Sequence, residues 1–67
     1  MQIEIPEGYT RWNGGNNPVP GKTVLVAMRP MAVGGKAAQM KKAYRADDIK
    51  GWLHNGNAGD IVAYKVI

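Results

Sequence analysis

The sequence has 67 residues, a formal net charge of +4, one histidine and no cysteine. A chain this short forms a single small domain, which we place over residues 1–67. The lack of cysteine excludes thiolate metal sites, iron–sulfur clusters and cysteine nucleophiles, and one histidine is too few for a transition-metal site, so we expect no cofactor.

The first half of the chain predicts a loop, a strand and a turn. Turn-forming residues dominate residues 12–21, where Asn13-Gly14 favours a turn with positive φ. Thr23–Met28 is β-branched and apolar on both faces, which predicts a buried strand at the centre of a sheet. Pro30 ends this strand, and the glycine pair in residues 31–35 predicts another turn.

The segment from Lys36 to Arg45 follows a different pattern. Its apolar side chains recur with a spacing of i, i+3 and i+7 among strong helix formers: Ala37, Met40, Ala43 and Tyr44. This spacing predicts one short helix. The alternative is a β-hairpin arm in which Lys41, Ala43 and Arg45 alternate with Lys42 and Tyr44, since ten residues are too few to decide.

The C-terminal third predicts a hairpin made of a strand at 51–54, a turn at 55–60 and a strand at 61–67. Asp60 is expected to accept hydrogen bonds from amides of the turn. In the last strand Val62, Tyr64 and Val66 alternate with Ile61, Ala63, Lys65 and Ile67. Both sets are largely apolar, so we expect this strand to lie inside the sheet.

Together these segments predict an α+β or mostly β fold, with a small antiparallel sheet of three to four strands and one short helix. Trp12, Trp52 and Tyr64 are the expected large core side chains, because the chain has no phenylalanine.

Groupings that could carry catalysis are weak. Gly21-Lys22-Thr23 matches the end of a phosphate-binding loop, but two prolines remove amide donors before it and a strand follows it. His54 has no serine to activate anywhere in the chain, and we interpret it as a residue beside a turn. Asp47-Asp48 fits a cap or turn better than a pair of catalytic carboxylates. We therefore expect no enzyme.

The remaining candidate is a basic segment, residues 36–50, that surrounds one tyrosine. Its partner-binding residues would be Lys36, Lys41, Lys42, Tyr44, Arg45 and Lys50. Cations around an aromatic ring suit an acidic protein groove or a phosphate backbone. On a helix Lys41 and Arg45 would form one stripe, although a solvated face without a partner explains the same residues. The sequence leaves homodimerisation open, because pairing would bury apolar strand faces.

No apolar run approaches the roughly 20 residues that span a bilayer. The N-terminal residues also lack a basic stretch before an apolar one. We therefore expect no membrane contact and a cytoplasmic location.

Both ends of the chain carry short motifs. They are Trp12-Asn13-Gly14-Gly15, Pro18-Val19-Pro20, Val24-Leu25-Val26, Trp52-Leu53-His54 and the block from Asp60 to Val66. Together they resemble a pattern in small uncharacterised proteins of bacteriophages and prophages, which typically end in Asp-Ile-Ile/Val-Ala-Tyr-Arg-Val. Lys65 stands where arginine is usual, and the stretch from Pro30 to Lys50 departs from the pattern. The resemblance implies a phage origin and a location in the host cytoplasm, and it implies no particular activity.

We therefore expect a non-enzymatic, phage-encoded accessory binding protein that engages a host or phage protein through the basic segment. The alternative is a nucleic-acid-binding module that uses the same segment, with an affinity that falls steeply as salt rises.

Overall fold

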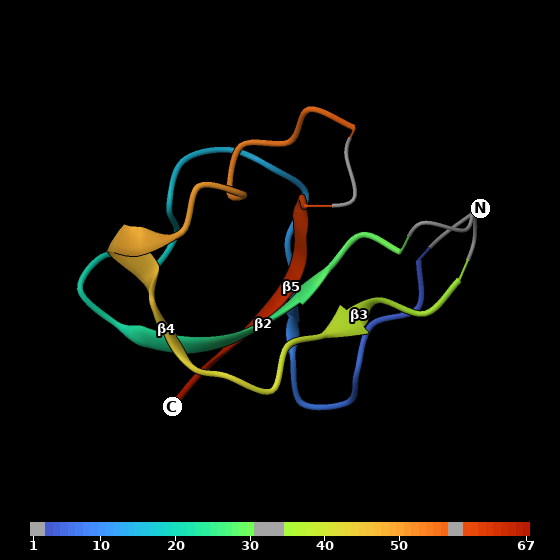
Figure 1. Cartoon of the computed structure of the whole chain (residues 1–67), viewed down its shortest axis with the longest axis horizontal. Helices are drawn as coiled ribbons and strands as arrows, with labels where there is room; N and C mark the ends of the chain where they lie inside the picture. Colours follow the sequence, from blue (N-terminus) through green and yellow to red (C-terminus); the bar gives the residue numbers. More distant parts are fainter. Residues whose placement is uncertain (1–2, 31–34, 57–58) are drawn as a thin grey trace.

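The computed structural model describes residues 3–30, 35–56 and 59–67. These residues form one antiparallel sheet of five strands, as Figure 1 shows. The elements are β1 (Thr10–Arg11), β2 (Thr23–Met28), β3 (Ala38–Gln39), β4 (Tyr44–Arg45), the 3-10 turn η1 (Ala46–Asp48) and β5 (Ile61–Val66). The prediction of a mostly β, antiparallel fold is confirmed, with five strands instead of three to four. Among the described residues no helix is long and apolar enough to cross a membrane.

The two longest strands, β2 and β5, form the centre of the sheet. The order is β1-β5-β2-β3, and β4 pairs with β2 as well. β2 was predicted as a buried central strand and β5 as a strand inside the sheet, and both positions are confirmed, although Lys65 and Val66 at the end of β5 are exposed. Each of these strands is a run of six residues rich in β-branched and apolar side chains, which favour the interior of a sheet.

A β-bulge near the start of β5 changes which side chains share a face. The pairing with β2 shifts register between Ala27 and Met28, so that Met28 lies opposite Ile61. Ile61 therefore belongs to the core cluster that Tyr64 packs against, and Val62 and Ala63 belong to a second cluster on the other face. The predicted alternation is therefore wrong at Ile61 and Val62, because a bulge offsets the period of two.

The predicted helix from Lys36 to Arg45 is wrong, because this segment is extended. β3 pairs with the end of β2 and β4 pairs with its beginning. Residues 40–43 bulge between them opposite Leu25 and Val26, and the Met40 amide donates to the Val26 carbonyl at 2.9 Å. The segment is thus one interrupted edge strand. Both halves pair antiparallel with β2, so the structure agrees with the alternative of an extended hairpin arm, interrupted at residues 40–43.

The predicted strand at residues 51–54 is also wrong, because the chain turns there instead of pairing along β5. The Ile61 amide donates to the Gly51 carbonyl at 2.9 Å. Gly51 lies so close to Gly59 that a Cβ at Gly51 would collide with the Gly59 carbonyl oxygen. The turns expected at 31–35 and 55–60 fall partly on residues 31–34 and 57–58, which lie outside the described residues.

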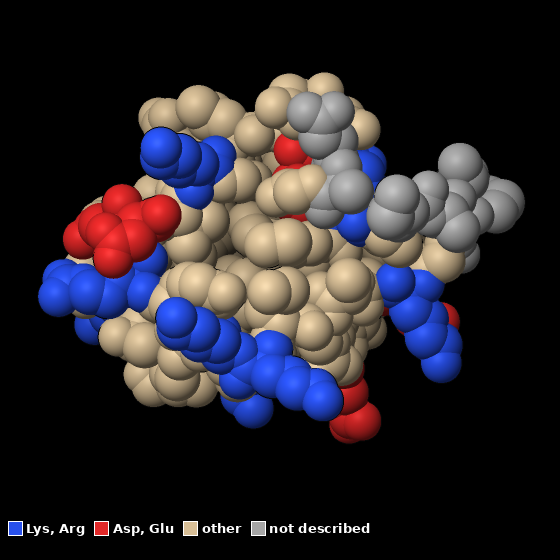
Figure 2. All heavy atoms as spheres, viewed as in Figure 1, with Lys and Arg blue, Asp and Glu red and all other residues tan. Residues whose placement is uncertain are grey.

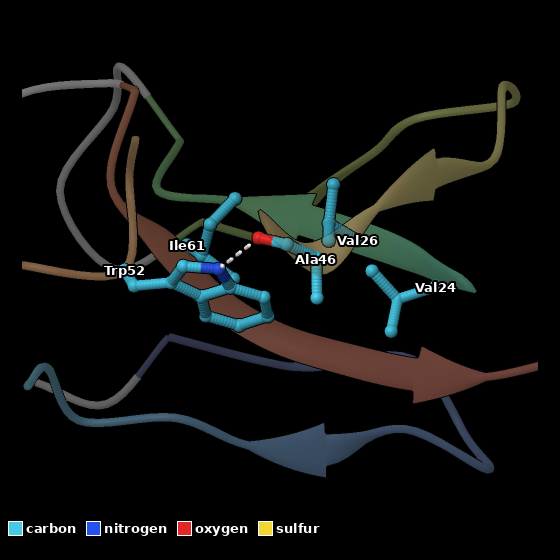
Figure 3. Close-up of a cluster of buried hydrophobic side chains, with 5 residues drawn as sticks. All are labelled: Val24, Val26, Ala46, Trp52 and Ile61. Atoms are coloured by element: carbon cyan, nitrogen blue, oxygen red, sulfur yellow. Dashed lines mark hydrogen bonds between the residues drawn. The ribbon is translucent and has the colours of Figure 1, made fainter. Parts of the chain in front are cut away.

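One face of the sheet carries the main core, which contains Val24, Val26, Ala46, Trp52 and Ile61 (Figure 3). Trp52 is only 3% exposed, and its indole nitrogen donates to the Ala46 carbonyl at 2.9 Å. Trp12 and Tyr64 pack against this cluster as predicted, and all three rings meet edge to face. The sequence alone did not decide which tryptophan is buried; the structure assigns that position to Trp52.

The other face is covered by the N-terminal segment. Ala27, Ala37, Val62 and Ala63 form its buried cluster, against which Ile3, Ile5 and Tyr9 pack. The Glu4 and Ala37 backbones hold the N-terminal segment beside the residues that precede β3, since the Ala37 amide donates to the Glu4 carbonyl at 2.8 Å. The apolar character of both faces of β2 and β5 is explained by these two coverings.

Candidate functional site

The basic segment lies along the edge of the sheet and the turn that follows it. Lys41 and Lys42 are exposed in the bulge between β3 and β4, and Arg45 is exposed in β4. Tyr44 is half-buried against the main core, and the Lys42 Nζ lies 5.8 Å from the centre of its ring. The stripe that a helix would have formed from Lys41 and Arg45 is therefore absent, but both cations remain on one edge.

Two other predicted site residues lie at the two ends of this edge. Lys50 is exposed just after η1, close to β4. Lys36 is exposed beyond the far end of β3, where it forms an isolated parallel bridge with Glu4. The structure therefore brings Lys42, Tyr44 and Lys50 to one region and leaves Lys36 apart from it.

An open hollow of about 190 Å³ lies in that region. Its lining consists of Val26, Met28, Tyr44, Asp48, Ile49, Lys50, Gly51, Gly59 and Ile61. Val26 and Ile61 belong to the buried core, and Met28, Tyr44 and Ile49 are half-buried against it. The hollow is therefore an apolar depression over one face of the sheet, reached between β4 and the turn at residues 49–51.

Charged side chains lie mostly around this depression. Figure 2 shows uncharged residues across the middle of this face, with lysine and arginine side chains and some aspartate or glutamate side chains around them. Of the lining residues only Asp48 and Lys50 carry a charge, and both are exposed. Within residues 3–30, 35–56 and 59–67 the one ion pair joins Arg29 to Asp60, so the lysines of the basic segment have no carboxylate partner there.

The sequence did not single out the apolar lining of the hollow as functional. Val26 and Ile61 were expected only as strand residues, and no pattern in the sequence pointed to Ile49. Gly51 is the one lining residue whose type indicates its role, because a glycine directly before a large core side chain is consistent with a close approach of two backbone segments. The hollow arises from contacts between residues far apart in the chain, which local patterns do not reveal.

Asp60 has the structural role that the sequence predicts. Its carboxylate accepts hydrogen bonds from the amides of Asn55 and Gly56, the latter at 2.8 Å, and pairs with Arg29 at 3.2 Å. Burial alone would raise the pKa of Asp60, but the two amides, Arg29 and His54 together hold that pKa below its ordinary value. Asp60 closes the turn before β5.

His54 is held on both ring nitrogens. Nε2 lies 2.5 Å from the Ile61 carbonyl oxygen, which can only accept, so Nε2 carries a proton. Nδ1 lies 3.4 Å from the Arg29 guanidinium and serves as the acceptor. The imidazole is thus fixed beside the turn, as the sequence indicated, and its partners are structural groups.

Gly21-Lys22-Thr23, which matches the end of a phosphate-binding loop, helps to hold in place the chain segment that precedes β2. The Gly21 amide donates to the Asp47 carboxylate at 3.2 Å, and Asn17 donates to the same carboxylate. Asp47 therefore anchors this loop to η1, in agreement with its predicted role at a turn. Across the described part of the chain, no three His, Asp or Glu side chains lie together where they could hold a metal ion.

Comparison with known proteins adds no assignment: no protein-family model, curated protein or solved structure matches this chain.

Proposed function

We propose that this chain is a non-enzymatic accessory binding protein, encoded by a phage and acting in the host cytoplasm, that engages a host or phage protein. The binding surface consists of the hollow together with exposed cations of the basic segment: Lys42 and Lys50 near the hollow, and Lys41 and Arg45 on the same edge of the sheet. The observation that carries the proposal is an apolar depression bordered by cations without carboxylate partners among the described residues.

This combination is typical of protein interfaces. An interface usually has an apolar centre that excludes water and a polar rim that orients the partner. Exposed lysines contribute little to the stability of a chain, so a group of them beside an apolar depression is explained better by an acidic partner. The resemblance to phage proteins supports the phage origin, and its departure over residues 30–50 is consistent with a partner that is specific to this chain.

The geometry favours a protein partner over a nucleic acid. A module that binds single strands stacks successive bases on exposed aromatic rings. Tyr44 is the one aromatic residue of the basic segment, and it is half-buried against the main core with Lys42 near its ring. An apolar floor formed by Val26, Met28 and Ile61 suits a hydrophobic side chain better than a phosphate backbone.

Affinity capture from a bacterial host lysate, run with and without nuclease at low and moderate salt, tests the proposal. The double variant Lys41→Glu/Lys42→Glu reverses two cations of the site. The matched control, Arg11→Glu/Lys65→Glu, makes the same change of charge on the other face of the sheet, since these residues pair with Ala63 and Leu25. We expect wild type and control to retain the same protein, and the site variant to lose it.

Two results would contradict the proposal. Equal retention by the site variant would remove the assigned surface. Recovery of nucleic acid alone, lost after nuclease treatment or at higher salt, would favour the nucleic-acid module instead.

A further inference from the structure

We infer that the hollow binds one aliphatic side chain of an acidic segment of the partner protein, with carboxylates beside that side chain facing Lys42 and Lys50. This inference rests on the proposed function and specifies the chemistry of the partner.

The size of the hollow limits what can occupy it. Sites for small molecules and cofactors have volumes of about 300–1,000 Å³. The hollow, at about 190 Å³, is smaller and is open on one side. One side chain of a larger molecule fits these dimensions, because the rest of that molecule remains outside.

The lining determines the polarity of the occupant. The floor is formed by Val26, Met28 and Ile61, and one wall by Ile49. Gly51 and Gly59 contribute no side chains, which leaves the depression open above the floor. A polar side chain would lose its water there without gaining partners, whereas an aliphatic side chain would gain from burial.

The charges around the hollow determine what flanks the occupant. Lys50 lies in the lining and Lys42 lies near the ring of Tyr44, whereas Arg45 pairs with Thr23 and so points to the other face of the sheet. Asp48 is the single carboxylate of the lining, so an acidic segment is repelled there and attracted on the side of the two cations. Charge complementarity therefore selects a segment with an aliphatic anchor and neighbouring aspartate or glutamate residues.

The experiment is an NMR titration of the ¹⁵N-labelled chain with the peptide acetyl-Glu-Asp-Leu-Asp-Glu-amide. A second peptide carries serine in place of leucine. We expect amide shifts centred on Met28, Tyr44, Ile49 and Ile61, and an affinity at least about tenfold lower for the serine peptide, as the loss of a buried leucine side chain implies.

Two variants test the assigned surface directly. Gly59→Leu places a side chain in the lining, where a Cβ meets no atom within 4 Å and the glycine has no positive φ. Lys50→Glu reverses a cation of the rim, and Lys65→Glu makes the same change on the other face as the matched control. We expect both site variants to lose at least about tenfold in peptide affinity and the control to match wild type. Unchanged tryptophan fluorescence shows that each variant is folded.

Three results would overturn the inference: shifts that map elsewhere, equal binding of the leucine and serine peptides, or full binding by folded Gly59→Leu. Tighter binding of an oligothymidylate to the same residues would also overturn it in favour of a nucleic acid. Its failure is distinguishable from failure of the proposed function. A lysate protein that is still captured by Gly59→Leu but lost by Lys41→Glu/Lys42→Glu would leave the proposed function standing without this occupant.

Discussion

At the scale of single residues, Trp52 links the main core to the turn that borders the hollow. Its ring lies 5.9 Å from Trp12 and 5.6 Å from Tyr64 between centroids, in edge-to-face contacts. Its carbonyl accepts the indole proton of Trp12 at 2.8 Å, and its own indole donates to Ala46. The prediction that these three aromatics are the large core side chains followed from composition, since such side chains provide most of the burial in a chain without phenylalanine; their mutual contacts were not predicted.

Trp52→Phe should lower the free energy of unfolding by about 2 kcal/mol, because it removes buried volume and takes away one of the two donors to the Ala46 carbonyl, which keeps the Ile49 amide. Leu53→Ala is the neighbouring control. Leu53 is 62% exposed, so its truncation should change stability by less than about 0.5 kcal/mol. Urea denaturation measures both, and equal losses would show that Trp52 does not hold the core as described.

Asp60 makes stability depend on pH in the acid range. Its pKa in the folded chain lies below the ordinary value of 3.8. Above that value both folded and unfolded chains carry the carboxylate, and its stabilising contribution is complete. As the pH falls below it, the unfolded chain takes up a proton that the folded chain does not, so stability is lost progressively until the folded pKa is reached.

Asp60→Asn should therefore be less stable than wild type near neutral pH, and the difference should shrink in acid. Urea denaturation of both chains at intervals from about pH 6 to about pH 2 measures this convergence. A constant difference across the range would show that the ion pair with Arg29 and the amide bonds from the turn do not act through the charge of Asp60.

At the scale of elements, the sequence predicts the strands that are long and misses those that are short. β2 and β5 have six residues each, enough for their patterns to be recognised. β3 and β4 have two residues each and depend on pairing with β2. The helical spacing of Ala37, Met40 and Tyr44 has another cause: Ala37 packs on one face of the sheet, and the bulge brings Met40 and Tyr44 to the other.

The bulge at residues 40–43 also protects the edge of the sheet. An exposed edge strand invites pairing with another chain, and proteins prevent this with short strands, bulges and lysines. Residues 38–45 combine all three, because Lys41 and Lys42 lie in the bulge that separates two very short strands. The same cations can thus serve both the proposed partner and the solubility of the chain.

Lys41→Val/Lys42→Val should therefore increase self-association, since two apolar β-formers replace charges on the edge. Sedimentation velocity over a range of concentrations should show a higher average mass for this variant than for wild type. Lys41→Gln/Lys42→Gln is the control that removes the charges without adding apolar surface, and it should associate less than the valine variant. Equal masses for all three chains would contradict a role of the bulge in edge protection.

At the scale of the whole molecule, both faces of the sheet are covered and an apolar depression lies near the basic segment. The sequence located the cations of this region but not its floor, because Val26, Ile49 and Ile61 come from three separate segments that meet only in the folded chain. It also assigned Lys36 to the same site, whereas the structure places this residue beside Glu4, beyond the far end of the edge. The kind of partner that we propose follows from net charge and local pattern, whereas the proposed place of binding follows from the fold.

The most direct test of this account is capture from host lysate, with and without nuclease treatment, by three chains: wild type, Lys41→Glu/Lys42→Glu and the control Arg11→Glu/Lys65→Glu. The account predicts one protein retained by wild type and control and lost by the site variant, with all three chains folded. Retention of that protein by the site variant, or capture of nucleic acid only in the untreated lysate, would contradict a protein-binding role for the basic segment.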